Sequence, residues 1–332
     1  MTTTPPSTDA FGPGVLALDH AVEAARITDW LRQTVARTLH RRGAIVAVSG
    51  GIDSALCATL AARALGADRV EALFLPEAAN SPAAADRARE LCRWLGVELG
   101  EQEIASPLRE LGCYRLQDEA IARVFPDLPP GSPHKITIAG DLLERDRSNL
   151  FDLVAQAPDG TLRRARLPLD AYLQLVAATN MKQRVRKLLE YSRAEARNYA
   201  VVGTPNRLEY ELGFFVRGGD GLADLKPIAH LYKTQVYALA AHLGVPQSIR
   251  DQPPSTETYT LPQTQQEFFF ALPFDQLDLL LWARDHAVPP ARIAEGMGLS
   301  PEQVDRALRD IEAKHKVAER LDQRALVPEL RR

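Results

Sequence analysis

The residues best suited to chemistry form the run Ser49-Gly50-Gly51-Ile52-Asp53-Ser54. Two adjacent glycines let the backbone approach a ligand closely, because no Cβ stands in the way. The two hydroxyls could contact phosphate oxygens, and the carboxylate could hold Mg²⁺ between phosphates. The run therefore predicts a phosphate site made by Ser49, Gly50, Gly51, Ile52, Asp53 and Ser54.

The flanking sequence predicts that this run joins a strand to a helix. Apolar residues 44–48 precede it and helix-forming residues 55–62 follow it. A helix that starts at such a turn directs its free amides and its positive dipole end at an anion. The run lacks the final Lys of the nucleotide-triphosphatase loop and the third glycine of the dinucleotide fingerprint. An ordinary glycine-rich turn is the alternative interpretation.

A second cluster of the same kind follows the predicted strand at residues 199–202. Gly203 and Thr204 end that strand, and Glu209 comes five residues later. Because parallel strands end at one edge of a sheet, Glu209 could complete a Mg²⁺ site with Asp53. The alternative is a glutamate that merely favours a helix N-terminus through the dipole.

Two further stretches carry candidate ligand contacts. Residues 213–224 contain several glycines that would be costly to order, which indicates either a loop that wraps a ligand or a mobile surface loop. Lys233 opens a predicted helix, where the dipole disfavours a cation, so its expected partner is a phosphate. Lys182 and Arg186 share one helix face, with Arg184 roughly opposite, and a solvated basic face is the simpler reading.

The order of predicted elements indicates an α/β fold with a doubly wound parallel sheet and a helical C-terminal portion. Such sheets bind ligands at the carboxyl ends of their strands. Residues 1–14 are expected to be disordered, and residues 15–332 to form one domain that begins with a helix over 17–40. An insertion at about 120–170 contains a β-hairpin with its turn at Asp159-Gly160.

Composition excludes several classes of protein. The chain has 332 residues, a net charge of −3, 45% hydrophobic residues and 25% charged residues, as in ordinary globular proteins. This charge argues against a nucleic-acid partner, and no apolar run has the length of a membrane span. Three scattered cysteines form no metal or disulfide pattern, and the N-terminus lacks signal-peptide features. A cytoplasmic location is expected.

Several motifs in one order resemble ammonia-dependent NAD synthetase, of the N-type ATP pyrophosphatase superfamily. Outside the insertion, the similarity covers most of residues 20–318. Beyond the first loop, the matching pieces are residues 182–186, Gly203-Thr204, Asn206, Glu209, 213–215, 219–221, Asp224, Pro227, 231–236, Pro254-Ser255, Glu267, 274–278 and 314–316.

The resemblance implies a role for each matching position. Asp53 and Lys233 would be catalytic, and Asp53 and Glu209 would hold Mg²⁺. ATP would be bound by residues 49–54 together with Thr204, Lys233 and Ser255. The dinucleotide substrate would be bound by Arg184, Arg217, Asp224, His315 and Lys316.

The implied reaction is the amidation of nicotinic acid adenine dinucleotide to NAD. ATP first adenylates the carboxylate and releases pyrophosphate, and ammonia then displaces AMP. Free ammonia is expected as the donor because the chain before the loop, about 48 residues, is too short for a glutaminase domain with its own core. The resemblance also implies a homodimer, which the apolar N-terminal helix could serve.

The chain departs from the family pattern at three places. Arg217 stands where Lys is common, which keeps the charge but changes its geometry. Gln266 replaces an acidic residue, and residues 268–270 are all Phe.

These departures leave three rival functions open. A related enzyme could amidate another carboxylate, such as nicotinate mononucleotide. A tRNA-modifying enzyme should carry a basic RNA surface, a zinc site or a catalytic cysteine set, and the sequence shows none of these. A catalytically dead nucleotide-binding module is disfavoured by the joint presence of Asp53, Glu209 and Lys233.

Overall fold

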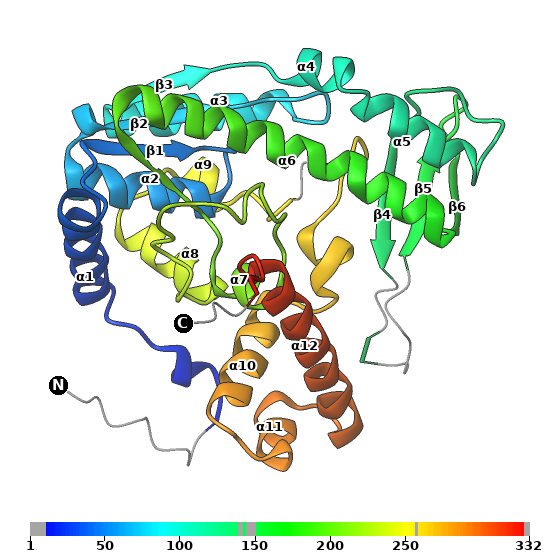
Figure 1. Cartoon of the computed structure of the whole chain (residues 1–332). Helices are drawn as coiled ribbons and strands as arrows, with labels where there is room; N and C mark the ends of the chain where they lie inside the picture. The colour runs from blue at the N-terminus through cyan, green and yellow to red at the C-terminus, as the bar shows by residue number, and fades with distance from the viewer. Residues whose placement is uncertain (1–10, 139–141, 144–150, 256–257, 329–332) are drawn as a thin grey trace.

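A sheet of four parallel strands forms the centre of the molecule (Figure 1). The structure is a computed structural model that describes residues 11–138, 142–143, 151–255 and 258–328. The strands lie in the order β3-β2-β1-β7, where β1 is Gly43–Ala47, β2 Val70–Phe74, β3 Glu98–Glu101 and β7 Tyr199–Val202. The predicted parallel α/β class is confirmed.

Helices cover both faces of this sheet, as a doubly wound fold requires. Along β1, Ala44 and Val46 pack into one core, while Ile45 packs into another on the opposite face. All three are fully buried, which explains why β1 reads as a continuous apolar run. One face is covered by α1 (His20–Gln33), α2 (Ile52–Leu65), α3 (Pro82–Leu95), α8 (Lys233–His242) and α9 (Gln247–Arg250). The other is covered by α4 (Ala105–Glu110), α5 (Cys113–Ala122) and α6 (Leu169–Arg197).

The strand order places two loops side by side. From β1 the chain proceeds to β2 and β3 on one side, whereas β7 joins β1 on the other. The loops after β1 and β7 therefore leave the same edge of the sheet at adjacent positions. In open α/β sheets this reversal of strand order creates the ligand crevice.

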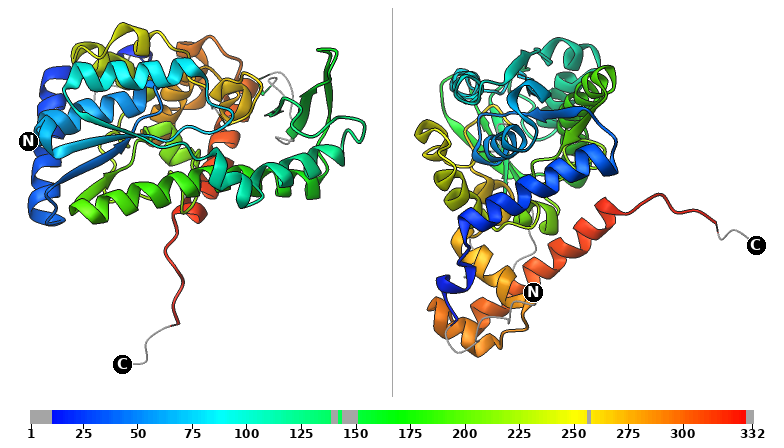
Figure 2. Two further views of the ribbon diagram at one scale, coloured as in Figure 1. Left: turned by 90° about the horizontal axis from the view of Figure 1, so that it is seen from above. Right: turned by 90° about the vertical axis from the view of Figure 1, so that its left-hand side faces the viewer.

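A second sheet is formed by β4 (His134–Ile138), β5 (Phe151–Gln156) and β6 (Leu162–Arg166), which are antiparallel in that order. The predicted hairpin is β5–β6, and Gly160 in its turn has a φ of 86°. The sequence analysis did not predict β4. Helix α6, 29 residues long, runs from the central sheet to the second sheet (Figures 1 and 2).

The C-terminal helices form a group of their own beside the central sheet (Figure 1). They share a separate apolar core. The last of them starts with the predicted capping box, in which Ser300 Oγ accepts from the amide of Gln303 at 3.2 Å. The group comprises α7 (Arg207–Leu212), α10 (Phe274–Asp285), α11 (Pro290–Met297) and α12 (Pro301–Asp322).

The N-terminal region differs from the sequence prediction. Residues 1–10 lie outside the described part of the chain, but the expected disorder does not extend to residue 14. Pro13–Leu16 form a 3-10 turn, and the ring of Phe11 lies 6.1 Å from that of Trp282. The first helix begins at His20 because the Asp19 carboxylate caps it. Within the described ranges, no helix combines the length and apolarity needed to cross a membrane.

Candidate active site

Gly50 turns the chain from β1 into α2. Its φ of 81° lies in the left-handed region, and a Cβ there would come within 2.7 Å of the carbonyl oxygen of Ala84. Arg87 on α3 donates to the carbonyl oxygen of Gly50 at 2.9 Å, which ties the turn to the neighbouring helix. Glycine is therefore required by both the backbone conformation and the available space.

The hydroxyls of the loop hold its shape, and α2 presents its free N-terminus to the crevice. Ser54 Oγ accepts from the amide of Ser49 at 3.2 Å and donates to the carbonyl oxygen of Gly51 at 3.0 Å. No described side chain caps the first turn of α2, whose N-cap is Gly51. Its amides thus remain available at the positive end of the helix dipole, as a phosphate site needs.

Asp53 and Lys233 meet although 180 positions separate them in the sequence. Lys233 Nζ forms an ion pair with Asp53 Oδ2, and the lysine side chain is only 1% exposed. Asn206 Nδ2 donates to the other carboxylate oxygen of Asp53 at 2.9 Å. A phosphate was the expected partner of Lys233, whereas its partner in the structure is Asp53, a candidate metal ligand.

Asp278 fixes the helix start that carries Lys233. Its carboxylate accepts from the amide of Lys233 at 3.1 Å and from the amide and hydroxyl of Thr234 at 2.8 and 2.7 Å. These bonds satisfy amides that the first turn of α8 leaves unpaired. A carboxylate at this position also offsets the unfavourable dipole that Lys233 meets.

Glu209 caps α7 and also faces the crevice. Its Oε2 accepts from the amide of Asn206 at 3.1 Å, and Gln265 Nε2 donates to its Oε1 at 3.1 Å. Burial, followed by the negative charge of Asp53, raises the pKa of Glu209 to about 8. The capping role foreseen as an alternative is therefore real, but a buried carboxylate beside a second one also has reason to bind a cation.

The donor set around Asp53 and Glu209 fits Mg²⁺. Hard Mg²⁺ takes few protein carboxylates and completes its shell with phosphate oxygens and water. The described residues contain no group of three or more His, Cys, Asp or Glu side chains able to hold a metal, so protein side chains alone do not complete a metal shell there. Gln265 Oε1 is buried and receives no hydrogen bond from the described residues, and a metal-bound water is a donor of the kind it lacks.

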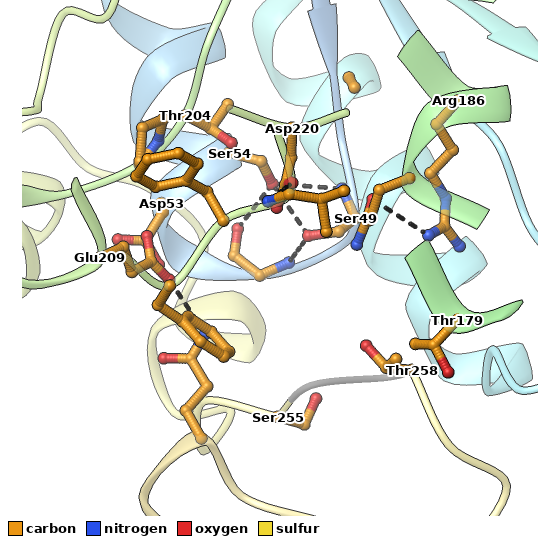
Figure 3. Close-up of a pocket in the computed structure, with 18 of the residues that line it drawn as sticks. Ser49, Asp53, Ser54, Thr179, Arg186, Thr204, Glu209, Asp220, Ser255 and Thr258 are labelled. Atoms are coloured by element: carbon orange, nitrogen blue, oxygen red, sulfur yellow. Dashed lines mark hydrogen bonds between the residues drawn. The ribbon is translucent and has the colours of Figure 1, made fainter. Parts of the chain in front are cut away.

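These groups face one cavity of about 600 Å³, a volume typical of small-molecule sites (Figure 3). Lys233 lies behind Asp53 rather than on the wall, and Gly50 faces Ala84. The candidate residues that line the cavity are Ser49, Gly51, Ile52, Asp53, Ser54, Thr204, Glu209, Ser255, Arg184 and Arg217.

The candidate dinucleotide-binding residues fall into two groups. Arg184 and Arg217 are exposed at the cavity and linked, because Arg184 Nε donates to the carbonyl oxygen of Arg217 at 3.3 Å. Asp224, His315 and Lys316 are not among the residues that line it. Asp224 accepts from the amide of Val201, His315 contacts the carbonyl oxygen of Glu211, and Lys316 pairs with Glu312. Binding of the dinucleotide by these three residues would therefore require a surface outside this cavity.

The glycine-rich loop is ordered around Asp220. The amide of Val216 donates to Asp220 Oδ1 at 2.7 Å, and the amides of Gly219 and Gly221 both donate to the carbonyl oxygen of Val216. A Cβ at Gly219 would lie 2.8 Å from the Cβ of Gln183 on α6. The loop therefore packs closely against α6 and lines the cavity, which supports the ligand-wrapping interpretation.

Several polar residues at the site received no site role from the sequence, although Asn206 and Arg186 were noted there. Asn206 and Gln265 orient the two candidate metal ligands, and Arg186 lines the cavity while bonding to Asn80 and the carbonyl oxygen of Leu75. The Asn-x-x-Glu spacing of a capping box would have revealed Asn206. Gln265 carries no such local signal, because its partner lies on another element.

One of the departures from the family pattern, the three consecutive Phe residues, has a structural explanation. The π-helical turn Gln266–Phe270 carries the three Phe residues. Phe268 and Phe269 line the cavity, whereas Phe270 is fully buried in the core of the C-terminal helices. Phe268 also packs against the core of the second sheet. The bulky triplet thus packs against two cores and also forms part of the cavity wall. Nothing in the structure explains Gln266 in place of a carboxylate.

Similarity to known proteins covers most of the chain. The sequence profile described as NAD synthase matches residues 23–125 and 137–319. The "NH(3)-dependent NAD(+) synthetase" of Rhizobium meliloti is 47% identical over 306 residues, which are 92% of this chain and 91% of that protein. The enzyme of the same name from Thermotoga maritima is 38% identical over 240 residues, 72% of this chain and 79% of that protein.

Solved structures share the fold at lower identity. NMN synthetase from Francisella tularensis has a TM-score of 0.65 at 22% identity and covers 95% of this chain and 100% of its own. NH3-dependent NAD synthetase from Campylobacter jejuni has a TM-score of 0.60 at 21% identity, over 94% and 100% of the two chains. The profile and the sequence identities, rather than these structures, decide membership: the chain belongs to the NAD synthase family.

Proposed function

We propose that this protein uses ATP and ammonia to convert nicotinic acid adenine dinucleotide to NAD. One observation carries the proposal: the free N-terminus of α2, Glu209 and Asp53, which is paired with the buried Lys233, converge on one cavity. That arrangement suits activation of a carboxylate by a nucleoside triphosphate. The substrate follows from the 47% identity to an ammonia-dependent NAD synthetase.

In the first step the substrate carboxylate attacks the α-phosphorus of ATP, a C(O)O–P bond forms and the bond to pyrophosphate breaks. The loop amides and the hydroxyls of Ser49 and Ser54 would hold the departing pyrophosphate. Lys233, already fixed by the cap at Asp278, would offset charge on the phosphates without reorganising. Mg²⁺ held by Asp53 and Glu209 would neutralise phosphate charge as it builds.

In the second step ammonia attacks the acyl carbon, so that a C–N bond forms, the C–O bond to AMP breaks and the attacking nitrogen releases one proton to solvent. The cavity favours this step by holding the adenylate beside the incoming nucleophile. Arg184 and Arg217 would hold the distal part of the dinucleotide, since guanidinium groups bind phosphate or carboxylate in a planar, bidentate manner.

The decisive experiment compares acids at equal concentration with ATP, Mg²⁺ and ammonium. The acids are nicotinic acid adenine dinucleotide, nicotinate mononucleotide, nicotinate and aspartate. The dinucleotide is expected to give the highest kcat/KM, with formation of NAD, AMP and pyrophosphate in equal amounts. A higher kcat/KM for the mononucleotide would overturn the substrate assignment and make the wall at Phe268 and Phe269 the first place to look.

Free ammonia is expected to be the nitrogen donor, and glutamine alone is expected not to serve. Glutamine hydrolysis needs a reactive thiolate. The three cysteines are buried, and burial raises the pKa of Cys92 and Cys113 to about 11 and that of Cys57 well above its ordinary value. Rates of NAD formation with ammonium chloride and with ammonia-free glutamine test this. Equal rates in the absence of any partner protein would refute it.

We also propose that the protein acts in the cytoplasm as a homodimer. Free cysteines fit a reducing compartment. Ile27 and Leu31 of α1 are buried within the chain, but Val22 and Trp30 of the same helix are 63% and 41% exposed. Light scattering after gel filtration should give twice the chain mass of 36.6 kDa. A monomer mass at micromolar concentration would contradict the dimer.

A further inference from the structure

The second sheet has one edge that is covered by another part of the chain. Strand β4 pairs with β5 on one side. On its other side lies the segment of residues 258–267, here called the wall segment, which leads into the π-helical turn against which β4 packs (Figure 1). The amide of His134 donates to Thr260 Oγ1 at 2.8 Å, and the amide of Leu261 donates to the carbonyl oxygen of His134 at 3.2 Å.

The contacts continue along the strand. The side chain of Gln263 donates to the carbonyl oxygen of Ile136. Thr137 Oγ1 donates to the carbonyl oxygen of Glu267 at 3.2 Å. Lys135 Nζ lies 2.7 Å from the Glu267 carboxylate and donates to the carbonyl oxygen of Pro262 at 3.1 Å. Four consecutive residues of β4 therefore hold the wall segment.

The centre of this joint is buried, whereas the bond of Lys135 to Pro262 is exposed. His134, Ile136 and Thr137 on the strand are at most 6% exposed, and Gln263 on the wall segment is 7% exposed. The rings of Tyr259 and Phe268 lie 5.7 Å apart in an edge-to-face arrangement. Because water cannot replace hydrogen bonds in such a joint without opening it, its geometry is well determined.

The wall segment ends at the metal-binding carboxylate. Gln265, 9% exposed, donates through Nε2 to Glu209 Oε1 at 3.1 Å. The other oxygen of Glu209 is held by its own helix through the amide of Asn206. Among the described residues, Gln265 is thus the one beyond α7 and its N-cap Asn206 that is hydrogen-bonded to the Glu209 carboxylate. The orientation of Glu209 consequently depends on where β4 places the wall segment.

We propose that the second sheet positions one ligand of the metal site, Glu209, and that Gln265 is the residue through which the sheet acts on it. Edge strand β4 fixes the wall segment, and Gln265 fixes the Glu209 carboxylate in the orientation that binds the divalent cation. The inference rests on the proposed use of a metal–nucleotide complex, but it concerns cation binding and not the identity of the acid. Residues that orient metal ligands typically change metal affinity about 10–100-fold when removed.

The first test replaces Gln265 by Met, which keeps the length and apolar volume but removes the amide. Mn²⁺ binding is measured by electron paramagnetic resonance in the presence of a non-hydrolysable ATP analogue. The dissociation constant for Mn²⁺ is expected to rise about tenfold, while analogue binding in EDTA stays at the wild-type value. An unchanged Mn²⁺ affinity would overturn the proposal.

The second test acts from a distance, and it decides the matter if Gln265→Met does not fold. Lys135→Met with Thr137→Val removes two anchors on β4; neither residue lines the cavity, although Ile136 between them does. The matched control, Arg164→Met with Arg166→Met, removes two exposed ion pairs to Asp152 from the other edge of the same sheet. The β4 variant is expected to weaken Mn²⁺ binding several-fold, and the β6 control is expected to leave it unchanged.

Two further readouts separate positioning from general stability. Hydrogen exchange should rise in the wall segment of the β4 variant and not in its control. Combining the β4 changes with Gln265→Met should add little to the loss of Mn²⁺ affinity, because both sets of changes act on Glu209 through the side chain of Gln265. Faster exchange with unchanged Mn²⁺ affinity would show a merely structural sheet and overturn the proposal. If the acid panel fails while Mn²⁺ affinity still depends on Gln265, the proposed function is wrong and this inference stands.

Discussion

Replacing Asp53 by Asn is expected to lower kcat by about 10²–10³-fold, the usual cost of one charge-stabilising contact at a reacting group. The amide keeps the size of the side chain and its place beside Asn206, but it is a poor ligand for Mg²⁺. It also leaves buried Lys233 without its carboxylate partner. The melting temperature is therefore expected to fall as well, because an uncompensated buried charge destabilises the fold.

The measurement is steady-state turnover at saturating Mg²⁺, at a temperature at which circular dichroism shows the variant to be folded. Asp86→Asn is the matched control, since Asp86 is 79% exposed and pairs only with Arg89 among the described contacts. The control should behave as the wild type. If Asp53→Asn kept more than about a tenth of the wild-type kcat, the metal role would be lost, since such a contact is worth about 10²–10³-fold.

Replacing Lys233 by Met is expected to reduce kcat by a similar factor, about 10²–10³-fold, for a different reason. The variant loses the fixed cation that offsets phosphate charge, while both carboxylates of the metal site remain. Exchange of labelled pyrophosphate into ATP, which reports the first step alone, should fall in parallel with overall turnover. Lys233→Met should still bind Mn²⁺ without nucleotide, because Asp53 keeps its carboxylate and loses a competing cation. Asp53→Asn, which lacks that carboxylate, should bind Mn²⁺ more weakly.

Lys233→Arg provides the comparison at constant charge. It should recover only part of the activity, because the wholly buried site is shaped for an ammonium and not for a planar guanidinium. Wild-type pyrophosphate exchange in the folded Lys233→Met protein would contradict the role of Lys233 in the first step.

The sequence by itself determined the elements whose signals are local. The strand at 44–48, the glycine turn and the helix after it all lie within one short stretch, and the turn is made at Gly50, whose φ is 81°. Strand β7 and the hairpin at Asp159-Gly160 likewise appear where periodicity and turn chemistry placed them. Such features follow from the nearest neighbours along the chain, because sterics and hydrophobic period act over a few residues.

Local sequence patterns predicted the structure less accurately where tertiary contacts determined it. Lys182 read most simply as part of a solvated basic face, yet it is buried in an ion pair with Glu77 at 3.0 Å and donates to the carbonyl oxygen of Thr258. Strand β4 escaped prediction because its pairing depends on β5 and on the distant wall segment. No periodicity in one segment can report a partner supplied by another.

The site itself combines both kinds of information. Residue types identified Asp53, Glu209 and Lys233 as candidates, but only the folded chain shows Lys233 paired with Asp53 and Glu209 held by Gln265. These pairings join segments far apart in sequence, and they lie in an interior where burial, followed by the negative charge of Asp53, raises the pKa of Glu209 to about 8. Sequence fixes which groups are available, whereas packing in a low-dielectric interior decides which of them meet and how strongly they interact.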